Sequence, residues 1–131
     1  MWPRRQTARP FLLEGDVIDF HKLGGLIPAV AQDAGTGEVL MVGFMNEEAL
    51  AITRRTGLAT FFSRTRNTLW TKGETSGNSL AVRQILLDCD RDTVLLKVDR
   101  KGDGVVCHTG ERSCFFSELA LEPAAAAGGA R

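Results

Sequence analysis

Short apolar runs separated by turn-forming residues are the main pattern of the chain between residues 27 and 98. Two of these runs, 27–31 and 39–45, flank the glycine-containing segment 33–37, which predicts a strand, a turn and a second strand. Because the run 39–45 is apolar on both alternating faces, it is expected to be a central strand. Runs rich in β-branched and aromatic residues predict four more strands, at 60–63, 68–71, 82–87 and 94–98.

Residues 46–56 carry the signals of a helix. Asn46 is a good N-cap, two acidic residues follow it, two arginines occupy the last turn, and Gly57 can close the helix in a left-handed conformation. One main helix among six strands indicates a β-rich α+β fold with several antiparallel strands.

The length of 131 residues corresponds to a single compact domain. We expect this domain over residues 15–121, because the apolar periodicity lies within these limits. Residues 1–14 are predicted to form a mobile N-terminal arm, and residues 122–131, rich in alanine and glycine, a disordered C-terminal tail.

The charge balance argues against some classes of binding protein. Sixteen basic residues offset sixteen acidic ones, which gives no support for a protein that binds nucleic acid or a membrane surface. No apolar run approaches the ~20 residues needed to span a bilayer. An odd count of three cysteines, without an export signal, argues against a disulfide framework, and we expect a cytoplasmic protein.

An acidic motif, Asp88-Cys89-Asp90-Arg91-Asp92, directly follows an apolar strand. In a fully extended chain Asp88 and Asp92 would lie about 13 Å apart, so the three carboxylates meet at one ion only if the chain bends here. Their mutual repulsion is relieved by a hard cation such as Mg²⁺. The alternative, a solvated acidic turn with Arg91 as counter-ion, has about equal support from the motif alone.

A second motif, Cys107-His108-Thr109-Gly110-Glu111-Arg112-Ser113-Cys114, contains the other two cysteines. Together with Cys89 they make three thiolates, which would form three-quarters of a tetrahedral zinc site and leave one position open for water. The alternative is that they are small buried hydrophobic residues, the usual fate of a free cysteine. His108 fits a general base, a fourth ligand or a turn residue.

A basic stretch without acidic residues covers 54–73 and runs into a loop of small polar residues. Arginine and lysine side chains beside a glycine-containing loop with hydroxyl groups suit the oxygens of phosphate. A solvated basic face is the alternative. The candidate substrate-binding residues are Arg64, Arg66, Trp70, Lys72, Thr75 and Ser76, with Trp70 able to stack on a base or to fill the core.

Taken together, these motifs resemble the phosphoribosyl-AMP cyclohydrolases of histidine biosynthesis. The resemblance covers about residues 23–116, nearly the whole predicted domain. The matching stretches are GLIPA (25–29), QD (32–33), GEVLM (37–41), MNEEAL (45–50), SR (63–64), LW (69–70), KGETSGN (72–78), DCD (88–90) and CHTGERSCFF (107–116).

The resemblance implies hydrolytic opening of the adenine ring of phosphoribosyl-AMP between N1 and C6. It implies one zinc ion per subunit on Cys89, Cys107 and Cys114, and magnesium on Asp88, Asp90 and Asp92. It further implies an intertwined homodimer in which the zinc ligands come from both chains.

On this basis we expect zinc-activated water to attack C6, with His108 handling a proton and magnesium organising substrate phosphate or ribose. Two other functions fit the same motifs. One is a non-catalytic, zinc-stabilised nucleotide-binding module, which would have a closed four-ligand site. The other is a zinc nucleotide deaminase, which would release ammonia, although the usual deaminase signature is missing.

Overall fold

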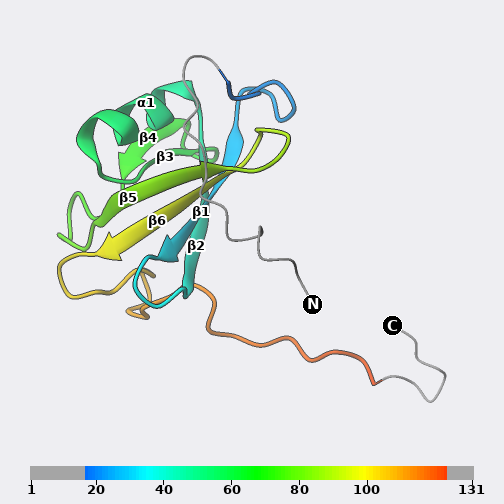
Figure 1. Ribbon diagram of the computed structural model, residues 1–131. Helices are drawn as coiled ribbons and strands as arrows, with labels where there is room; N and C mark the ends of the chain where they lie inside the picture. The colour runs from blue at the N-terminus through cyan, green and yellow to red at the C-terminus, as the bar shows by residue number, and fades with distance from the viewer. Residues whose placement is uncertain (1–16, 124–131) are drawn as a thin grey trace, which may run out of the picture.

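The structure is a computed structural model that describes residues 17–123. A four-stranded sheet has the order β2-β1-β6-β5, and a two-stranded hairpin pairs β3 with β4 (Figure 1). The strands are β1 (Ile27–Asp33), β2 (Val39–Met45), β3 (Thr60–Ser63), β4 (Thr68–Thr71), β5 (Leu80–Leu87) and β6 (Val94–Arg100), and the helix is α1 (Glu47–Thr56). The predicted β-rich α+β class is confirmed.

All six predicted strands are present, three of them with the predicted bounds and three longer by two residues, but the predicted central place of the second strand is wrong. β2 is an edge strand, because its one neighbour in the four-stranded sheet is β1. The apolar residues of β2 differ in exposure: Leu40, Met41 and Met45 are buried, whereas Val39 and Val42 are 42% and 48% exposed. The pairing of β1 with β6 is parallel, so the sheet is mixed.

The helix forms as its capping residues predict. The Asn46 side chain accepts a hydrogen bond from the backbone N–H of Ala49 at 2.8 Å, which satisfies one of the free donors of the first turn. Gly57 ends the helix with φ 78°, and its N–H donates to the carbonyl of Thr53. The helix buries Ala49, Leu50 and Thr53.

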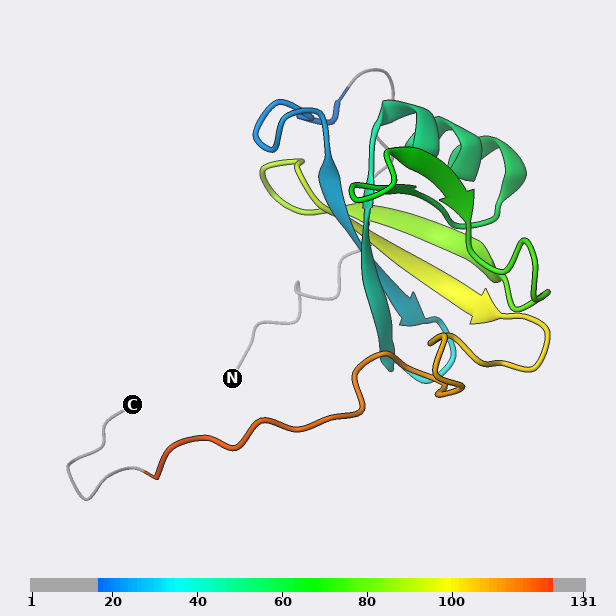
Figure 2. The same cartoon turned by 180° about the vertical axis from the view of Figure 1, so that it is seen from behind.

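The core lies on one side of the four-stranded sheet. Figure 2 shows α1 and the β3–β4 hairpin lying over this side, which carries the fully buried residues Ile27, Ala29, Val94 and Leu96. β1 and β6 alternate buried and partly buried residues, as strands covered on one face do.

Phe61 of β3 joins the hairpin to the sheet. Its ring is fully buried and lies against Gly43, where an added Cβ would come within 2.7 Å of the ring. On its other side the ring packs against Trp70, with 5.0 Å between ring centroids. Gly43 is therefore required by close approach, and Trp70 is part of the packed hairpin.

A buried ion pair fastens the end of β1. One oxygen of Asp33 accepts the N–H groups of Gly35 and Thr36, and the other accepts Arg100 Nε at 2.9 Å. The hydrogen bond from Thr36, together with those from Arg100 and Gly35, lowers the pKa of Asp33 to about 2, against the opposing effect of burial. The carboxylate thus holds both the turn after β1 and the neighbouring strand β6.

Replacing Asp33 by Asn is expected to reduce stability by about 1–2 kcal/mol at neutral pH, since one pKa unit corresponds to about 1.4 kcal/mol and part of the pair reaches solvent. The native pKa is below the ordinary value of 3.8, so this stabilisation is present above about pH 4 and is lost as the pH falls towards 2. Urea unfolding at several pH values measures it. The exposed substitution Asp103→Asn is the control, and an unfolding difference that stays constant down to pH 2 would contradict the assignment.

The other side of the sheet is not covered by any helix or strand within residues 17–123, as Figure 1 shows. The strand register places one apolar residue of each strand in a row across this side: Val42, Val30, Leu95 and Leu86. We call this side, with that row, the open face.

The predicted N-terminal arm, and all of the predicted C-terminal tail except residues 122 and 123, lie outside the described residues. Between residues 17 and 123, no helix has the length and apolar character needed to cross a membrane.

Candidate active site and metal centre

The three aspartates of the acidic motif gather after the end of β5. Asp88 Oδ1 accepts the N–H groups of Asp92 at 3.0 Å and Thr93 at 3.2 Å, and Arg91 adopts a left-handed conformation with φ 62°. This bend brings one oxygen each of Asp88, Asp90 and Asp92 to within 4.8 Å of one another. The bend that the sequence required is present, and the three carboxylates form the oxygen-rich donor set that magnesium prefers.

Lys22 lies among these carboxylates. Its ammonium group is 2.9 Å from Asp90 Oδ2 and 3.0 Å from Asp92 Oδ2. The hydrogen bonds to Asp90 and Asp92 raise the pKa of Lys22, and the bond from Lys22 is the main cause that lowers the pKa of Asp92. A positive charge from segment 17–26 therefore already stabilises the ionised carboxylates.

Cys107 and Cys114 lie together at the start of β2. The Cys114 N–H donates to the carbonyl of Leu40 at 2.7 Å, and the Ser113 hydroxyl donates to the carbonyl of Val39 at 2.8 Å. The Glu111 carbonyl accepts the N–H of Cys107, which closes the loop between the two cysteines. Each of the two thiols shifts the pKa of the other, so the loop brings the two sulfur atoms near one another.

The surroundings of this pair favour ionisation of one thiol. The Thr109 hydroxyl donates to Cys107 Sγ at 3.1 Å, and this bond and the Thr109 N–H lower the pKa of Cys107. Burial and the neighbouring Cys107 sulfur raise the pKa of Cys114. Lys72 lowers the pKa of both thiols through its charge, and its ammonium donates to the carbonyl of Val106, next to Cys107. A thiolate beside a second thiol suits a soft metal ion.

Cys89 does not join this pair within one chain. The pair lies at the start of β2, near the end of β6 and the start of β5, whereas Cys89 follows the far end of β5 (Figure 1). The eight residues of β5 span roughly 23 Å at about 3.3 Å per residue. Among residues 17–123, the three aspartates are the one group of three metal-ligand side chains that the fold gathers.

His108 is exposed next to Cys107, where solvent and substrate can reach it. His108 is a residue of the tight turn in which the Gly110 N–H donates to the Cys107 carbonyl at 2.9 Å. The structure therefore keeps His108 beside the cysteine pair.

The candidate substrate residues occupy different environments. Arg64 lies with its guanidinium 4.1 Å from the centroid of the Phe44 ring, and Trp70 packs on Phe61. The side chains of Arg66, Thr75 and Ser76 are on the exposed surface of the hairpin and the following loop. Lys72 is half-buried and faces the cysteine pair rather than open solvent.

The sequence analysis missed two residues of these sites. Lys22 is 68 positions from Asp90, and no local pattern connects them. Thr109 has a local signal, because a hydroxyl two residues after a cysteine in a glycine-containing turn can reach its sulfur.

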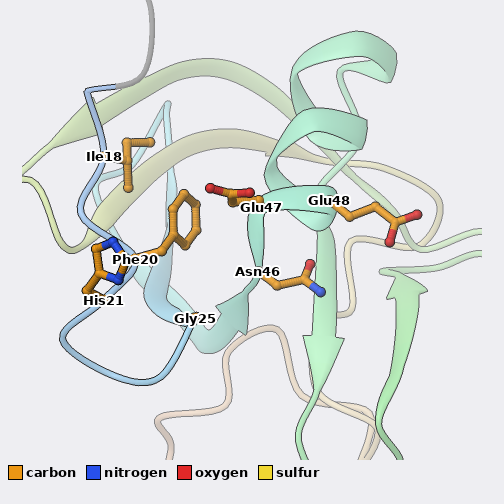
Figure 3. Close-up of a pocket in the computed structure, with 7 residues that line it drawn as sticks. All are labelled: Ile18, Phe20, His21, Gly25, Asn46, Glu47 and Glu48. Carbon is orange, nitrogen blue, oxygen red and sulfur yellow. The ribbon is translucent and has the colours of Figure 1, made fainter.

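A hollow of about 520 Å³ lies between segment 17–26 and the start of α1. Figure 3 shows Phe20, His21 and Glu47 around it. This volume is within the range of small-molecule sites. The same segment contacts the acidic turn, since the Asp19 N–H donates to the Arg91 carbonyl at 2.8 Å.

Comparison with known proteins gives one consistent result. A family model described as phosphoribosyl-AMP cyclohydrolase matches residues 41–116, which include the acidic motif and the cysteine pair. The chain is 61% identical over 102 residues to phosphoribosyl-AMP cyclohydrolase of Desulforapulum autotrophicum, covering 78% of this chain and 81% of that protein. It is 59% identical over 99 residues to the enzyme of the same name from Geotalea uraniireducens, covering 76% and 78% of the two chains. It is 56% identical over 103 residues to that of Nitratidesulfovibrio vulgaris, covering 79% and 81%. The chain therefore belongs to the phosphoribosyl-AMP cyclohydrolase family of hydrolases.

Proposed function

We propose that this enzyme hydrolyses the adenine ring of phosphoribosyl-AMP between N1 and C6, giving the formimino-carboxamide ribonucleotide of histidine biosynthesis in the cytoplasm. The observation that carries the proposal is the family match across residues 41–116, which contain both clusters of candidate ligands. A hydrolase of this kind needs an activated water, an anchor for phosphorylated substrate and a group that moves a proton.

The residues present fit zinc. Cys107 and Cys114 supply two adjacent sulfur atoms, and Thr109 and Lys72 favour the thiolate form that zinc binds. Cys89 of a second copy would supply the third sulfur, which leaves one tetrahedral position open. When bound, zinc lowers the pKa of a water molecule so that attack on C6 is feasible at neutral pH. A homodimer with one zinc ion per subunit and ligands from both chains follows from this assignment.

The residues present also fit magnesium. Asp88, Asp90 and Asp92 offer three oxygen ligands within 4.8 Å of one another, and the ion pairs of Asp90 and Asp92 with Lys22 support a site for positive charge. Magnesium there would neutralise the charge of a substrate phosphate or orient the substrate ribose.

The chain's own side chains complete the assignment. His108, exposed beside Cys107, moves a proton between the attacking water and the opening ring. The exposed side chains Arg64, Arg66, Thr75 and Ser76 bind the substrate phosphates, whereas Lys72 acts beside the cysteine pair and Trp70 serves the packing of the hairpin.

The test is ultraviolet absorbance with phosphoribosyl-AMP before chelation, after chelation and after zinc and magnesium are added back. Metal-dependent ring opening without ammonia release supports the cyclohydrolase. Ammonia release would instead indicate a deaminase. Stoichiometric zinc without turnover of either kind would indicate a non-catalytic nucleotide-binding module.

Replacing Asp90 by Asn is expected to keep the bound zinc but to weaken the response of turnover to magnesium by at least about tenfold, because one of three charged ligands becomes neutral. The magnesium concentration at half-maximal rate measures the effect, and metal analysis measures zinc. If the variant loses zinc instead, the assignment of zinc to the cysteines and magnesium to the aspartates is wrong.

Lys22→Met is the matched variant on the same cluster. It removes the competing ammonium without changing a proposed ligand, so magnesium should act at a lower concentration than in the parent protein. An unchanged magnesium response in both variants would show that the three aspartates do not bind the ion.

A further inference from the structure

The loop that follows β4 is held against the turn that follows β6. We call residues 72–79 the glycine loop. Asn78 Oδ1 accepts the backbone N–H of Asp103 at 2.8 Å, and the Ser79 carbonyl accepts the N–H of Lys101 at 2.9 Å. Figure 2 shows the two segments side by side. The glycine loop therefore has a fixed place on the molecule.

Close packing and one hydrogen bond fix the Asn78 side chain. A Cβ added to Gly102 would collide with Asn78 Oδ1, and one added to Gly73 would collide with the backbone carbonyl carbon of Asn78. Because an N–H group needs an acceptor, the oxygen of the Asn78 amide is the atom that faces the Asp103 N–H. The amide nitrogen, Nδ2, therefore occupies the other position, and the fold sets the direction of its two N–H groups.

The Nδ2 group of Asn78 reaches solvent. Asn78 is half-buried, and within residues 17–123 its Nδ2 donates to no acceptor. Among these described residues no side-chain nitrogen or oxygen is both fully buried and without a partner, so this nitrogen is accessible. Two oriented N–H donors without an internal acceptor can bind a ligand that carries oxygen atoms.

Other donors of the glycine loop are in the same condition. Ser76 Oγ accepts the Asn78 N–H at 3.1 Å, which leaves the proton of the Ser76 hydroxyl free to donate. The backbone N–H groups of Thr75 and Ser76 have no acceptor in the part of the chain that the structure describes. Hydroxyl and amide donors gathered on one loop suit the oxygens of a phosphate group.

The glycine loop begins beside the cysteine pair. Lys72 is its first residue, and the Lys72 ammonium donates to the carbonyl of Val106, the neighbour of Cys107. The turn that Asn78 contacts, at 101–104, leads into the same cysteine-containing loop. A phosphate group on the glycine loop would therefore lie near the proposed zinc site.

We propose that Asn78 is a further substrate-binding residue, and that its side-chain NH₂ group donates to a phosphate oxygen of the substrate. The inference rests on the proposed function, because it takes the phosphorylated substrate named there. Asn78 adds to Thr75 and Ser76 a donor whose direction is fixed by the fold before substrate arrives. A preoriented donor loses little conformational freedom when it binds, so it should contribute directly to substrate affinity.

The central variant is Asn78→Asp. It keeps the oxygen that accepts the Asp103 N–H and replaces the NH₂ group by a second oxygen that carries negative charge. Loss of the donor and repulsion of phosphate should raise the KM for phosphoribosyl-AMP at least about tenfold. The dissociation constant of phosphoribosyl-AMP with chelated, zinc-free protein should rise by a similar factor. The kcat should change by less than about twofold, because the bond is made in the ground state as well as in the transition state.

Asn46→Asp is the matched control. It makes the same chemical change at a residue whose side-chain oxygen also accepts a backbone N–H, that of Ala49. Aspartate caps helices as asparagine does, so the fold should be kept. The glycine loop lies near the other end of α1, since the Lys72 N–H donates to the carbonyl of Ala59, and the ten residues of α1 span about 15 Å. Both constants should equal those of the parent protein.

Asn78→Ala separates substrate binding from a purely structural role. It removes the donor and the acceptor together and adds no charge. We expect both constants to rise while bound zinc, measured by metal analysis, stays at the parent level. If zinc is lost together with substrate affinity, Asn78 acts by holding the turn that leads into the cysteine loop, and the inference is wrong.

The remaining outcomes also decide the question. Parent-like constants in Asn78→Asp, or an equal rise in Asn46→Asp, would overturn the inference. If circular dichroism shows that Asn78→Asp does not fold, the constants and zinc content of Asn78→Ala decide. If the parent binds phosphoribosyl-AMP and Asn78→Asp weakens this binding, but the ring opens under no metal condition, the inference stands and the proposed function fails. If the ring opens and Asn78→Asp resembles the parent, the inference alone fails. A parent protein that does not bind phosphoribosyl-AMP would overturn both.

Discussion

Replacing Cys107 by Ser is expected to remove bound zinc and to lower turnover by more than about 100-fold. Loss of a residue that only supports a metal ligand costs up to about 100-fold, so loss of a ligand itself should cost more. A serine hydroxyl stays protonated at neutral pH and binds zinc poorly, so only two of the three proposed sulfur ligands remain, Cys114 and Cys89 of the second copy. Metal analysis of the purified variant and the absorbance assay measure both effects. Full activity with stoichiometric zinc in this variant would remove Cys107 from the site.

Cys89→Ser is the matched variant, because it makes the same chemical change at the far end of β5. It should lose zinc and turnover to the same degree, although within one chain it lies at the opposite end of the sheet from Cys107. Mixed dimers of the two variants contain one intact set of three cysteines in each heterodimer. Random mixing of the two chains should therefore restore about a quarter of the parent activity, as expected for a two-fold assembly.

The mixing experiment has a clear negative outcome. If Cys89→Ser and Cys107→Ser each abolish turnover but their co-expressed mixture stays inactive, the three sulfur atoms do not come from two chains. Two different affinity tags, one on each variant chain, and purification on both in sequence establish that mixed dimers were present. If only one of the two variants loses activity, only the cysteine replaced in that variant is needed for turnover.

Replacing Phe61 by Ala is expected to destabilise the fold by about 3–5 kcal/mol, the usual cost of removing a fully buried aromatic side chain. The ring fills the space over Gly43 and carries Trp70 on its other side, so the cavity would open between the sheet and the β3–β4 hairpin. Denaturant unfolding followed by circular dichroism measures the change.

Phe61→Leu is the control, because it keeps much of the buried volume and should cost clearly less. The hairpin ends one residue before Lys72, which donates to the carbonyl beside Cys107. We therefore expect Phe61→Ala to weaken zinc binding under conditions where the protein is still folded. A loss of stability under about 1 kcal/mol would show that the neighbouring side chains fill the space.

Local elements of this fold were predictable because their signals are local. Asn46 caps α1 and Gly57 ends it within one residue of the predicted bounds, since each satisfies backbone groups of its own helix. The turn at 33–37 and the strands on either side follow from glycine and from apolar runs. The bend in the acidic motif was required only by the hypothesis of a shared ion, and in the structure it is held locally, because Asp88 Oδ1 accepts the N–H groups of Asp92 and Thr93.

Long-range arrangements were not predictable in the same way. The edge position of β2 depends on the parallel pairing of β1 with β6, which joins residues more than 60 positions apart. An exposed Val42 and a buried Met41 look alike in a sequence of apolar residues. The salt bridge of Lys22 with Asp90 and the separation of Cys89 from the cysteine pair arise in the same way, from strand order rather than from any local pattern.

The ammonium of Lys22 bears on whether the protein can fold before it binds a metal ion. A chain that supplies its own cation to a cluster of carboxylates can reach its native form before any metal arrives. On the proposed magnesium assignment, uptake of the divalent ion would exchange one cation for another, and its rate would include the departure of Lys22. Because Lys22 belongs to the segment that borders the hollow beside α1, loading the ion would loosen one wall of that hollow.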